Sequence, residues 1–593
     1  MALRARVGAS PPCRARGRRA SSARRRARVG VGVGVCDDDD DDDARAGRRA
    51  RASSSSIAFD DAHAFVETFA ASGLAVRCEP TAHGGEAVVV ATSRSARALV
   101  GSSDEYDDDD DEYGDADVLS GAAPWRGAKS YACAYGGHQF GQWAGALGDG
   151  RCVTLGRVRD ARVDVQLKGA GRTPFSRNGD GRAVLRSSIR EYVASEAMFA
   201  LGVPTTRALA LVATNAGVVR STASNASRLE PGAVVTRVAE TFVRFGSFQL
   251  PWSRRDFATT RKLADFVMDA SYGVFSAEEL ACTRGVDYDD ACTRGVDYDD
   301  AYGAFVAAVA RRTAITLARW QSIGFTHGVL NTDNMSVAGL TIDYGPFGFM
   351  EAYDVGYTPN QSDLFGDRMY SFANQPSAVR WNLERFLESC DRLATRKDRA
   401  RALEIFDEAF SAEIYATFTR KFGVWIRDDD EYEIVRSFHR VLQRGAFDFT
   451  LSHRSLGAFA STVLARGESA TAPALALDMF ASVRRAQDGR EDEAMDDALR
   501  LQIADFGAMY AEILLRERGD PELIRAAQDS ANPLYVPRNY LLQRVIESAE
   551  RDDFEPLRAL CATLEHPYRE QPGAERFAQP ASVEQHARVG CLS

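Results

Sequence analysis

Three short segments of the chain hold the residues best suited to chemistry. The first is Gly148-Asp149-Gly150-Arg151, a glycine-rich turn that leads into a strand-like run. Glycines let backbone N–H groups approach phosphate oxygens closely, and the adjacent arginine adds a charge that can bind phosphate in a bidentate manner. The turn matches neither the dinucleotide fingerprint nor the Walker A pattern. By itself it is a weak indication of phosphate binding, because most such turns are simple hairpins.

The second segment begins at Lys168, which ends an alternating, strand-like run. Glu191 lies further on, inside a helical pattern over residues 183–201, and a turn containing Asp180 and Gly181 lies between them. A lysine on a strand that pairs with a glutamate on the next helix holds phosphates in kinase-type folds. The alternative is a surface lysine and an unrelated helical carboxylate.

The third segment contains His327–Asn334 and, nine residues later, Asp343. Kinase catalytic loops place an asparagine five residues after the catalytic aspartate. Counting back five residues from Asn334 reaches Val329, so the usual base is absent, whereas Asn334 and Asp343 keep the spacing of two Mg²⁺ ligands. Asp333 is the nearest carboxylate that could act as a base. A capped hairpin without chemistry is the alternative, and the ordered set of Lys, Glu, Asn and Asp argues against it.

The elements that must position these residues follow from hydrophobic periodicity. The pattern predicts strands and then long helices, an α+β layout with a β-rich N-lobe and a larger helical C-lobe. Together with the kinase-type spacing of the three segments, this layout predicts a bilobal, protein-kinase-like fold with extra C-terminal helices. The expected elements are strands at Val153–Leu155 and Val163–Leu167, helices at 183–201 and 302–323, a motif region at 325–353, and mainly amphipathic helix over 363–569. The predicted division is a disordered or transit segment (1–56), an N-lobe with nucleotide motifs (57–250), a catalytic and metal-binding part of the C-lobe (251–360), a helical region (361–575) and a tail (576–593).

Composition restricts the class of protein. The chain has 593 residues, of which 45% are hydrophobic and 26% charged, the profile of a globular enzyme. No run approaches the roughly 18 apolar residues of a membrane-spanning helix. The net charge of −11 argues against a dedicated nucleic-acid binder. The ten cysteines include no C-x-x-C pair, so neither a zinc site nor a disulfide framework is predicted.

Some segments have a biased composition. Residues 1–56 contain 14 arginines, no lysine and the run Asp37–Asp43. The Arg-, Ala- and Ser-rich start predicts an organelle transit peptide, with a disordered basic tail as the alternative. The acidic stretch 104–112 is expected to be a solvated loop. Residues 281–290 and 291–300 are identical, which indicates a recent duplication in a surface loop or an error of sequence assembly.

Long runs of the three segments closely resemble the selenoprotein O family. They are GGHQFGQWAGALGDGR (136–151), QLKGAGRTPFSRNGDGRAVLRSSIRE (166–191), THGVLNTDNMS (326–336) and LTIDYGPFGFM (340–350). The resemblance implies a kinase-like fold that binds ATP in an inverted orientation and transfers AMP to Ser, Thr or Tyr hydroxyls. It implies nucleotide contacts by Gly148, Gly150, Arg151, Lys168, Asp180, Gly181, Arg237, Arg244 and Asp343, metal ligation by Asn334 and Asp343, proton acceptance by Asp333, and orientation of Lys168 by Glu191.

The resemblance also sets expectations for cofactors, partners and location. It implies ATP as substrate with Mg²⁺ or Mn²⁺, protein substrates that offer hydroxyl groups, redox-related protein partners, and the mitochondrion, with a plastid as the alternative. Cys591 lies third from the end, where animal members carry selenocysteine, so it is a candidate redox residue or else an inert tail thiol. Two other functions stay open: a kinase that transfers the γ-phosphate, and a pseudokinase scaffold that binds ATP without catalysis.

Overall fold

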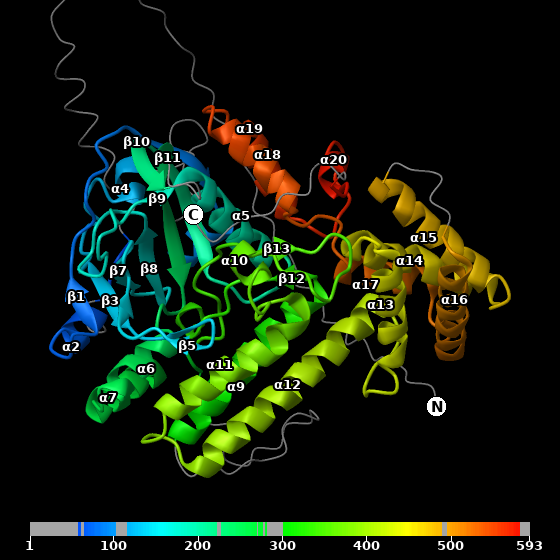
Figure 1. The fold of residues 1–593 in the computed structure, drawn as a ribbon, viewed down its shortest axis with the longest axis horizontal. Coiled ribbons are helices and arrows are strands. Elements are labelled where there is room, and N and C mark those ends of the chain that lie inside the picture. Colours follow the sequence, from blue (N-terminus) through cyan, green and yellow to red (C-terminus); the bar gives the residue numbers. More distant parts are fainter. Residues whose placement is uncertain are drawn as a thin grey trace, which may run out of the picture. The chain divides into compact units, whose positions relative to one another are not determined.

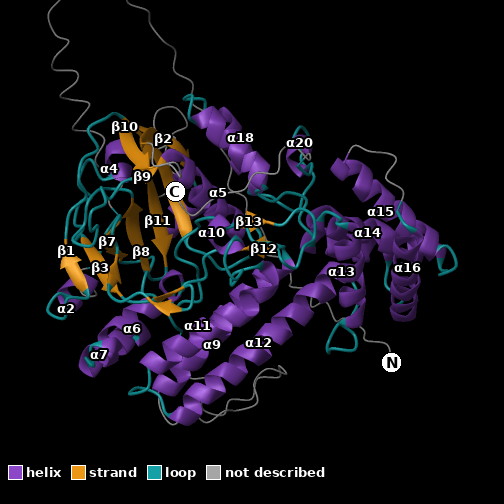
Figure 2. Ribbon diagram, in the orientation of Figure 1, coloured by secondary structure: helices purple, strands orange, loops and turns teal. Residues whose placement is uncertain are grey.

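An antiparallel sheet occupies the first part of the chain (Figures 1 and 2). The computed structural model describes residues 57–60, 64–101, 115–221, 227–269, 271–276, 279–280, 301–488 and 495–581. The predicted transit segment, the acidic stretch 104–112, the duplication 281–300 and Cys591 lie outside the described residues.

Within the described residues the sheet has nine strands, and its main path runs β1-β3-β7-β8-β11-β10-β2. Strand β6 pairs with β3, and β9 pairs with β11. The strands are β1 (Ala75–Arg77), β2 (Ala87–Thr92), β3 (Tyr131–Tyr135), β6 (Leu147–Gly148), β7 (Cys152–Val158), β8 (Val163–Lys168), β9 (Ala183–Val184), β10 (Arg207–Ser221) and β11 (Ser227–Ala239). The two strands expected at 153–155 and 163–167 are confirmed as β7 and β8.

The pleat of β8 decides which side chains face the site. Val165 and Leu167 are buried in an apolar cluster on one face of the sheet. Side chains alternate along a strand, so Gln166 and Lys168 point to the opposite face. Arg237 of β11 lies directly across from Gln166 and shares that face. The register of two neighbouring strands therefore brings a lysine and an arginine together.

Helix α5 (Leu185–Ala200) covers this face and carries Glu191. Its buried side chains pack with residues of β10 and β11 in one core. The helix was expected from residue 183, but Ala183 and Val184 form β9 instead, because they pair with Ala233 and Gly232 of β11.

Helices make up the second part of the chain. The expected helix at 302–323 is confirmed as α9 (Ala301–Ser322), which packs along α12 (Arg396–Phe422). Helices α18 (Asn539–Ala549) and α19 (Glu555–Leu564) return to contact α5, as Figure 1 shows. The other helices before α12 are α2 (Phe65–Phe69), α3 (Arg94–Leu99), α4 (Ala116–Ser120), α6 (Phe245–Ser253), α7 (Phe257–Met268), α10 (Gln361–Leu364) and α11 (Gln375–Ser389). Those after it are α13 (Glu433–Gly445), α14 (Phe449–Arg466), α15 (Ala472–Asp488), α16 (Asp497–Glu517), α17 (Pro521–Ala531) and α20 (Glu575–Ala578).

Helices α13 to α16 enclose a separate apolar cluster with the C-terminal half of α12. None of the helices in the described part of the chain is both long and apolar enough to cross a membrane.

Candidate nucleotide-binding and catalytic site

One polar cleft collects eleven of the predicted site residues. Its volume is about 610 Å³, within the range of small-molecule sites. The eleven residues are Gly148, Gly150, Arg151, Lys168, Asp180, Gly181, Arg237, Arg244, Asp333, Asn334 and Asp343. Gly148, Lys168 and Arg237 lie on strands of the sheet, and loops that follow the strands supply another five residues. The segment after α9 supplies the last three. The spacing in the sequence therefore corresponds to a single site, although the chemical role of each residue stays a prediction.

Lys168 lies at the centre of a buried ion-pair network. Its Nζ is 2.6 Å from Oε2 of Glu191, the partner expected on α5. The other carboxylate oxygen of Glu191 accepts a hydrogen bond of 2.8 Å from Nη1 of Arg237. Lys168 also pairs with Asp343. Because all four groups are charged and paired, the network holds the lysine rigidly at the wall of the cleft.

Asp343 is held ionised by this arrangement. It lies in a loop after an isolated bridge between Met335 and Thr341. Burial alone would raise the pKa of Asp343, but the positive charges of Lys168, Arg151 and Arg237 outweigh burial and lower the pKa well below its usual value. A carboxylate that stays charged at every physiological pH is suited to bind a cation.

The segment 325–349 carries Asp333, Asn334 and Asp343 and is named the catalytic segment for its predicted role. Short-range pairing orders it. Strands β12 (Phe325–Thr326) and β13 (Gly348–Phe349) pair at its two ends, and a 3₁₀ turn covers Thr332–Asn334. The Nδ2 of Asn334 donates a 3.0 Å hydrogen bond to the carbonyl of Val329. Val329 stands at the position where a kinase has its catalytic aspartate.

Asp333 is buried, and burial makes its carboxylate a stronger proton acceptor than that of an exposed aspartate. Burial raises the pKa of Asp333 above its usual value, and the charge of Arg244 opposes this only in part. Arg244 donates to the backbone carbonyl of Asp333 at 2.9 Å, and Gln139 donates to its Oδ2 at 3.1 Å. Oδ1 has no hydrogen-bond partner among the described residues. An unpartnered buried carboxylate oxygen is available to accept a proton from an incoming group.

The residues present fit a divalent cation that is shared with phosphates. The backbone N–H of Ile342 donates to the carbonyl of Asn334 at 3.0 Å. This bond holds the neighbouring segments that carry Asn334 and Asp343 side by side. Within the described part of the chain, no group of three His, Cys, Asp or Glu could hold a metal alone. Two oxygen donors at a polar cleft match Mg²⁺, which completes its shell with phosphate oxygens and water.

The glycines at the cleft are required by close packing. A Cβ on Gly148 would lie 2.4 Å from the ring of Phe175. Gly181 has a φ of +70°, and a Cβ there would lie 2.0 Å from the carbonyl of Gly171. Any larger residue at either place would displace the loops that line the cleft.

Sequence reasoning missed several residues of the site. Asp149 is buried inside the first glycine turn, where it accepts hydrogen bonds from the backbone of Cys133 at 3.0 Å and from Arg244 at 3.2 Å. Arg220 of β10 pairs with Asp180 at 2.8 Å. Asp149 could have been found from its place between the predicted residues Gly148 and Gly150. Arg220 could not be found from local sequence, because it lies 40 residues from its partner Asp180.

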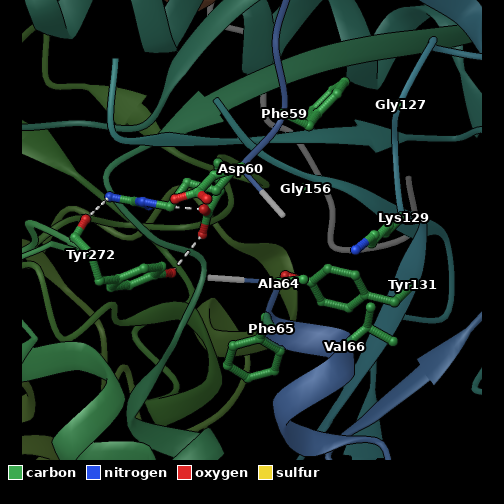
Figure 3. A pocket seen from close by; sticks show the side chains of 12 residues that line it. Phe59, Asp60, Ala64, Phe65, Val66, Gly127, Lys129, Tyr131, Gly156 and Tyr272 are labelled. Carbon is green, nitrogen blue, oxygen red and sulfur yellow. Dashed lines mark hydrogen bonds and ion pairs between the residues drawn. The ribbon is translucent and has the colours of Figure 1, made fainter. Parts of the chain in front are cut away.

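A second cavity, shown in Figure 3, is not a ligand site. It has a volume of about 10 Å³, room for about one water molecule. Its polar wall is a structural ion pair, in which Arg157 lies 2.9 Å from Asp164 and 3.8 Å from the centre of the Tyr272 ring.

Comparison with known proteins agrees with the geometry. The family model described as protein adenylyltransferase SelO matches residues 101–565. The chain is 40% identical to the protein nucleotidyltransferase YdiU of Tolumonas auensis over 480 residues, which cover 80% of this chain and 85% of the relative. It is 40% identical to the protein of the same name from an Azoarcus species over 85% of this chain and 90% of the relative. It is 41% identical to that of Bordetella parapertussis over 78% and 85% of the two chains. This chain therefore belongs to the protein adenylyltransferase SelO family.

Proposed function

We propose that this protein transfers AMP from ATP to hydroxyl side chains of other proteins. The observation that carries the proposal is the cleft itself, in which Lys168, Arg237 and Arg244 face Asp333, Asn334 and Asp343. The sheet and the segment after α9 both contribute to this cleft, which supports a bilobal, kinase-like arrangement of the two parts. Family membership supports the same reaction.

The chain's own groups account for each part of the transfer. The acceptor hydroxyl oxygen bonds to the α-phosphorus of ATP, and Asp333 takes its proton. The bond between the α-phosphorus and the oxygen that bridges to the β-phosphate breaks, so pyrophosphate leaves with the electron pair. Arg151, Lys168 and Arg237 are placed to neutralise the charge that develops on the phosphates.

Asn334 and Asp343 would hold the metal ion, and we propose Mg²⁺ for this place. When bound, it neutralises phosphate charge and orients the phosphates. Burial raises the pKa of Asp333, which moves it towards the working pH and makes the carboxylate a stronger proton acceptor.

The test compares transfer of label from α-labelled and γ-labelled ATP to protein, with Mg²⁺ present and after chelation. We expect Mg²⁺-dependent label from the α position, little from the γ position, and a protein mass gain equal to AMP. Label only from the γ position would identify a kinase, and no label from either would identify a scaffold.

Two variants separate metal binding from proton transfer. Asp343→Ala should abolish labelling, because the metal loses a ligand. Asp333→Ala should slow labelling by about 10²–10⁴-fold with little change in ATP affinity measured by calorimetry. Asp497→Ala, an exposed carboxylate on α16, is the matched control and should behave as the wild type.

A further inference from the structure

A short hairpin is attached directly to the catalytic segment. It consists of β4 (His138–Gln139) and β5 (Gln142–Trp143), and Figure 1 shows β5 between the sheet and α11. The backbone N–H of His138 donates to Oγ1 of Thr332 at 2.7 Å. The backbone N–H of Phe140 donates to the side-chain oxygen of Asn331 at 3.2 Å. These two bonds flank the contact between Gln139 and Asp333, so the hairpin and the catalytic segment are held in one geometry.

The hairpin contacts the Asp333 carboxylate, although none of residues 136–147 lines the cleft itself. Oδ2 accepts from the Gln139 amide at 3.1 Å. Gly137 lies so close that a Cβ there would be 3.0 Å from Oδ1. Asp333 itself lines the cleft together with the groups assigned to the nucleotide. An acceptor hydroxyl that hydrogen-bonds to Asp333 and attacks the nucleotide therefore lies on the cleft side of this carboxylate, next to the hairpin.

The hairpin exposes two aromatic side chains. Phe140 is 39% exposed and Trp143 is 42% exposed. Phe140 has a φ of +48°, a region that a bulky residue occupies only at a cost. Strained residues that persist next to a reaction centre indicate a functional constraint. The ring of Phe140 rests on Tyr370 at 5.2 Å, and that of Trp143 on His138 at 5.1 Å, so both are held in place.

The same stretch carries no formal charge. Residues 136–147 contain no Asp, Glu, Lys or Arg, although these make up 26% of the chain. Burial lowers the pKa of His138, which keeps its ring neutral near pH 7. Single exposed apolar residues are common on proteins. Here two aromatic rings lie on the same uncharged turn, each is fixed by a contact with a neighbouring ring, and the turn contacts Asp333. This combination indicates a binding surface more strongly than a single exposed apolar residue does.

We propose that Phe140 and Trp143 form the docking surface for the acceptor polypeptide. An apolar, uncharged side chain next to the modified residue packs on the two rings, and the acceptor hydroxyl hydrogen-bonds to Asp333 on the side of the carboxylate that faces the nucleotide. The inference rests on the proposed AMP transfer and deepens it, because it names what the enzyme recognises beside the hydroxyl.

The test uses two pools of ten-residue peptides, each with one central Ser, Thr or Tyr. The flanking positions are Leu in one pool and Asp in the other, on an otherwise Ala-based backbone. With α-labelled ATP, we expect kcat/KM for the Leu pool to exceed that for the Asp pool by about tenfold or more. Phe140→Asn and Trp143→Ala should remove this preference through KM, while ATP affinity stays unchanged.

Phe140→Asn is chosen because asparagine tolerates a positive φ, so the variant should unfold at or above the wild-type temperature. Trp425→Ala removes a ring that is 64% exposed far along the chain, and it should keep the preference for the Leu pool.

The outcomes separate the two proposals. If the wild type labels proteins but treats both pools alike or labels neither, the docking inference is wrong and the AMP transfer stands. The docking inference is also wrong if Phe140→Asn keeps the wild-type preference for the Leu pool. It is wrong as well if Phe140→Asn changes only the sedimentation of the protein, because the surface would then bind a second copy of the chain. If the wild type transfers no α-label to any protein or peptide, both proposals fall.

Discussion

Lys168 shows how single residues in the cleft depend on one another. Its ammonium group pairs with Glu191 and Asp343, and Glu191 also pairs with Arg237. A buried charge is tolerated only when it is paired. Glu191 and Asp343 each have two cationic partners, Lys168 and Arg237, so each carboxylate keeps a partner when one cation is removed. If Asn334 and Asp343 held a metal ion, Glu191 would still keep Lys168 in place.

We expect Lys168→Ala to weaken transfer strongly and to leave the fold intact. The loss of one charge-assisted contact to the phosphates should cost about 2–4 kcal/mol of transition-state stabilisation. Glu191 stays paired with Arg237, so thermal unfolding should change little. The measurement is kcat/KM with α-labelled ATP, beside Lys262→Ala as control, an exposed lysine whose Nζ donates to the Thr68 carbonyl. Activity near that of the wild type would contradict a role in phosphate binding.

Local spacing allowed part of the site to be predicted. Lys168 and Glu191 are 23 residues apart on a strand and the following helix, so their approach follows from local structure. The contact of Gln139 with Asp333 spans 194 residues. Such contacts depend on how the sheet packs against the helical part, and no pattern in the sequence contains that information.

Helices α12, α13 and α14 contain a group of buried titratable side chains that does not line the cleft. Lys421 of α12 is buried, and no acidic group among the described residues offsets its burial. Burial lowers the pKa of Lys421 to about 7. Burial and the charge of Lys421 together lower the pKa of His439 on α13 to about 3 and that of His453 on α14 well below its usual value. The packing of these helices therefore favours neutral side chains.

We expect Lys421→Met to stabilise the protein without changing activity. Between pH 7 and 10.5 the unfolded chain binds the Lys421 proton and the folded chain does not, so wild-type stability rises with pH in that window. The variant should lack this rise and gain on the order of 1–4 kcal/mol near pH 7. The measurement is the free energy of unfolding from denaturant titrations at pH 7 and pH 10. Lys397→Met, an exposed lysine on the same helix, should keep the wild-type pH dependence. An unchanged pH dependence in Lys421→Met would show that Lys421 is charged in the folded protein.

At the scale of the whole molecule, the order of strands before helices could be predicted, but the extent of the sheet could not. Strands β7 and β8 alternate clearly in the sequence. Strands β10 and β11 have 15 and 13 residues and form the longest pairing of the sheet. They were not predicted individually. Strand β10 contains the continuous apolar run Ala208–Ala213, which does not distinguish a buried strand from a buried helix. Strand β11 contains Pro231 and Gly232, two residue types that are depleted in strands.

The last prediction concerns the start of the chain, where the family match does not reach, since it begins at residue 101. Residues 1–56 carry 14 arginines and no lysine, and ten of these arginines fall within Met1–Arg28. A basic, Ser- and Ala-rich start is typical of organelle transit peptides. We expect a fluorescent protein fused behind residues 1–60 to enter mitochondria, with plastids as the alternative. A matched fusion in which the arginines of Met1–Arg28 are replaced by glutamine should remain diffuse, because import depends on positive charge. If both fusions are diffuse, residues 1–56 do not direct transport, and the basic start is better explained as a charged tail.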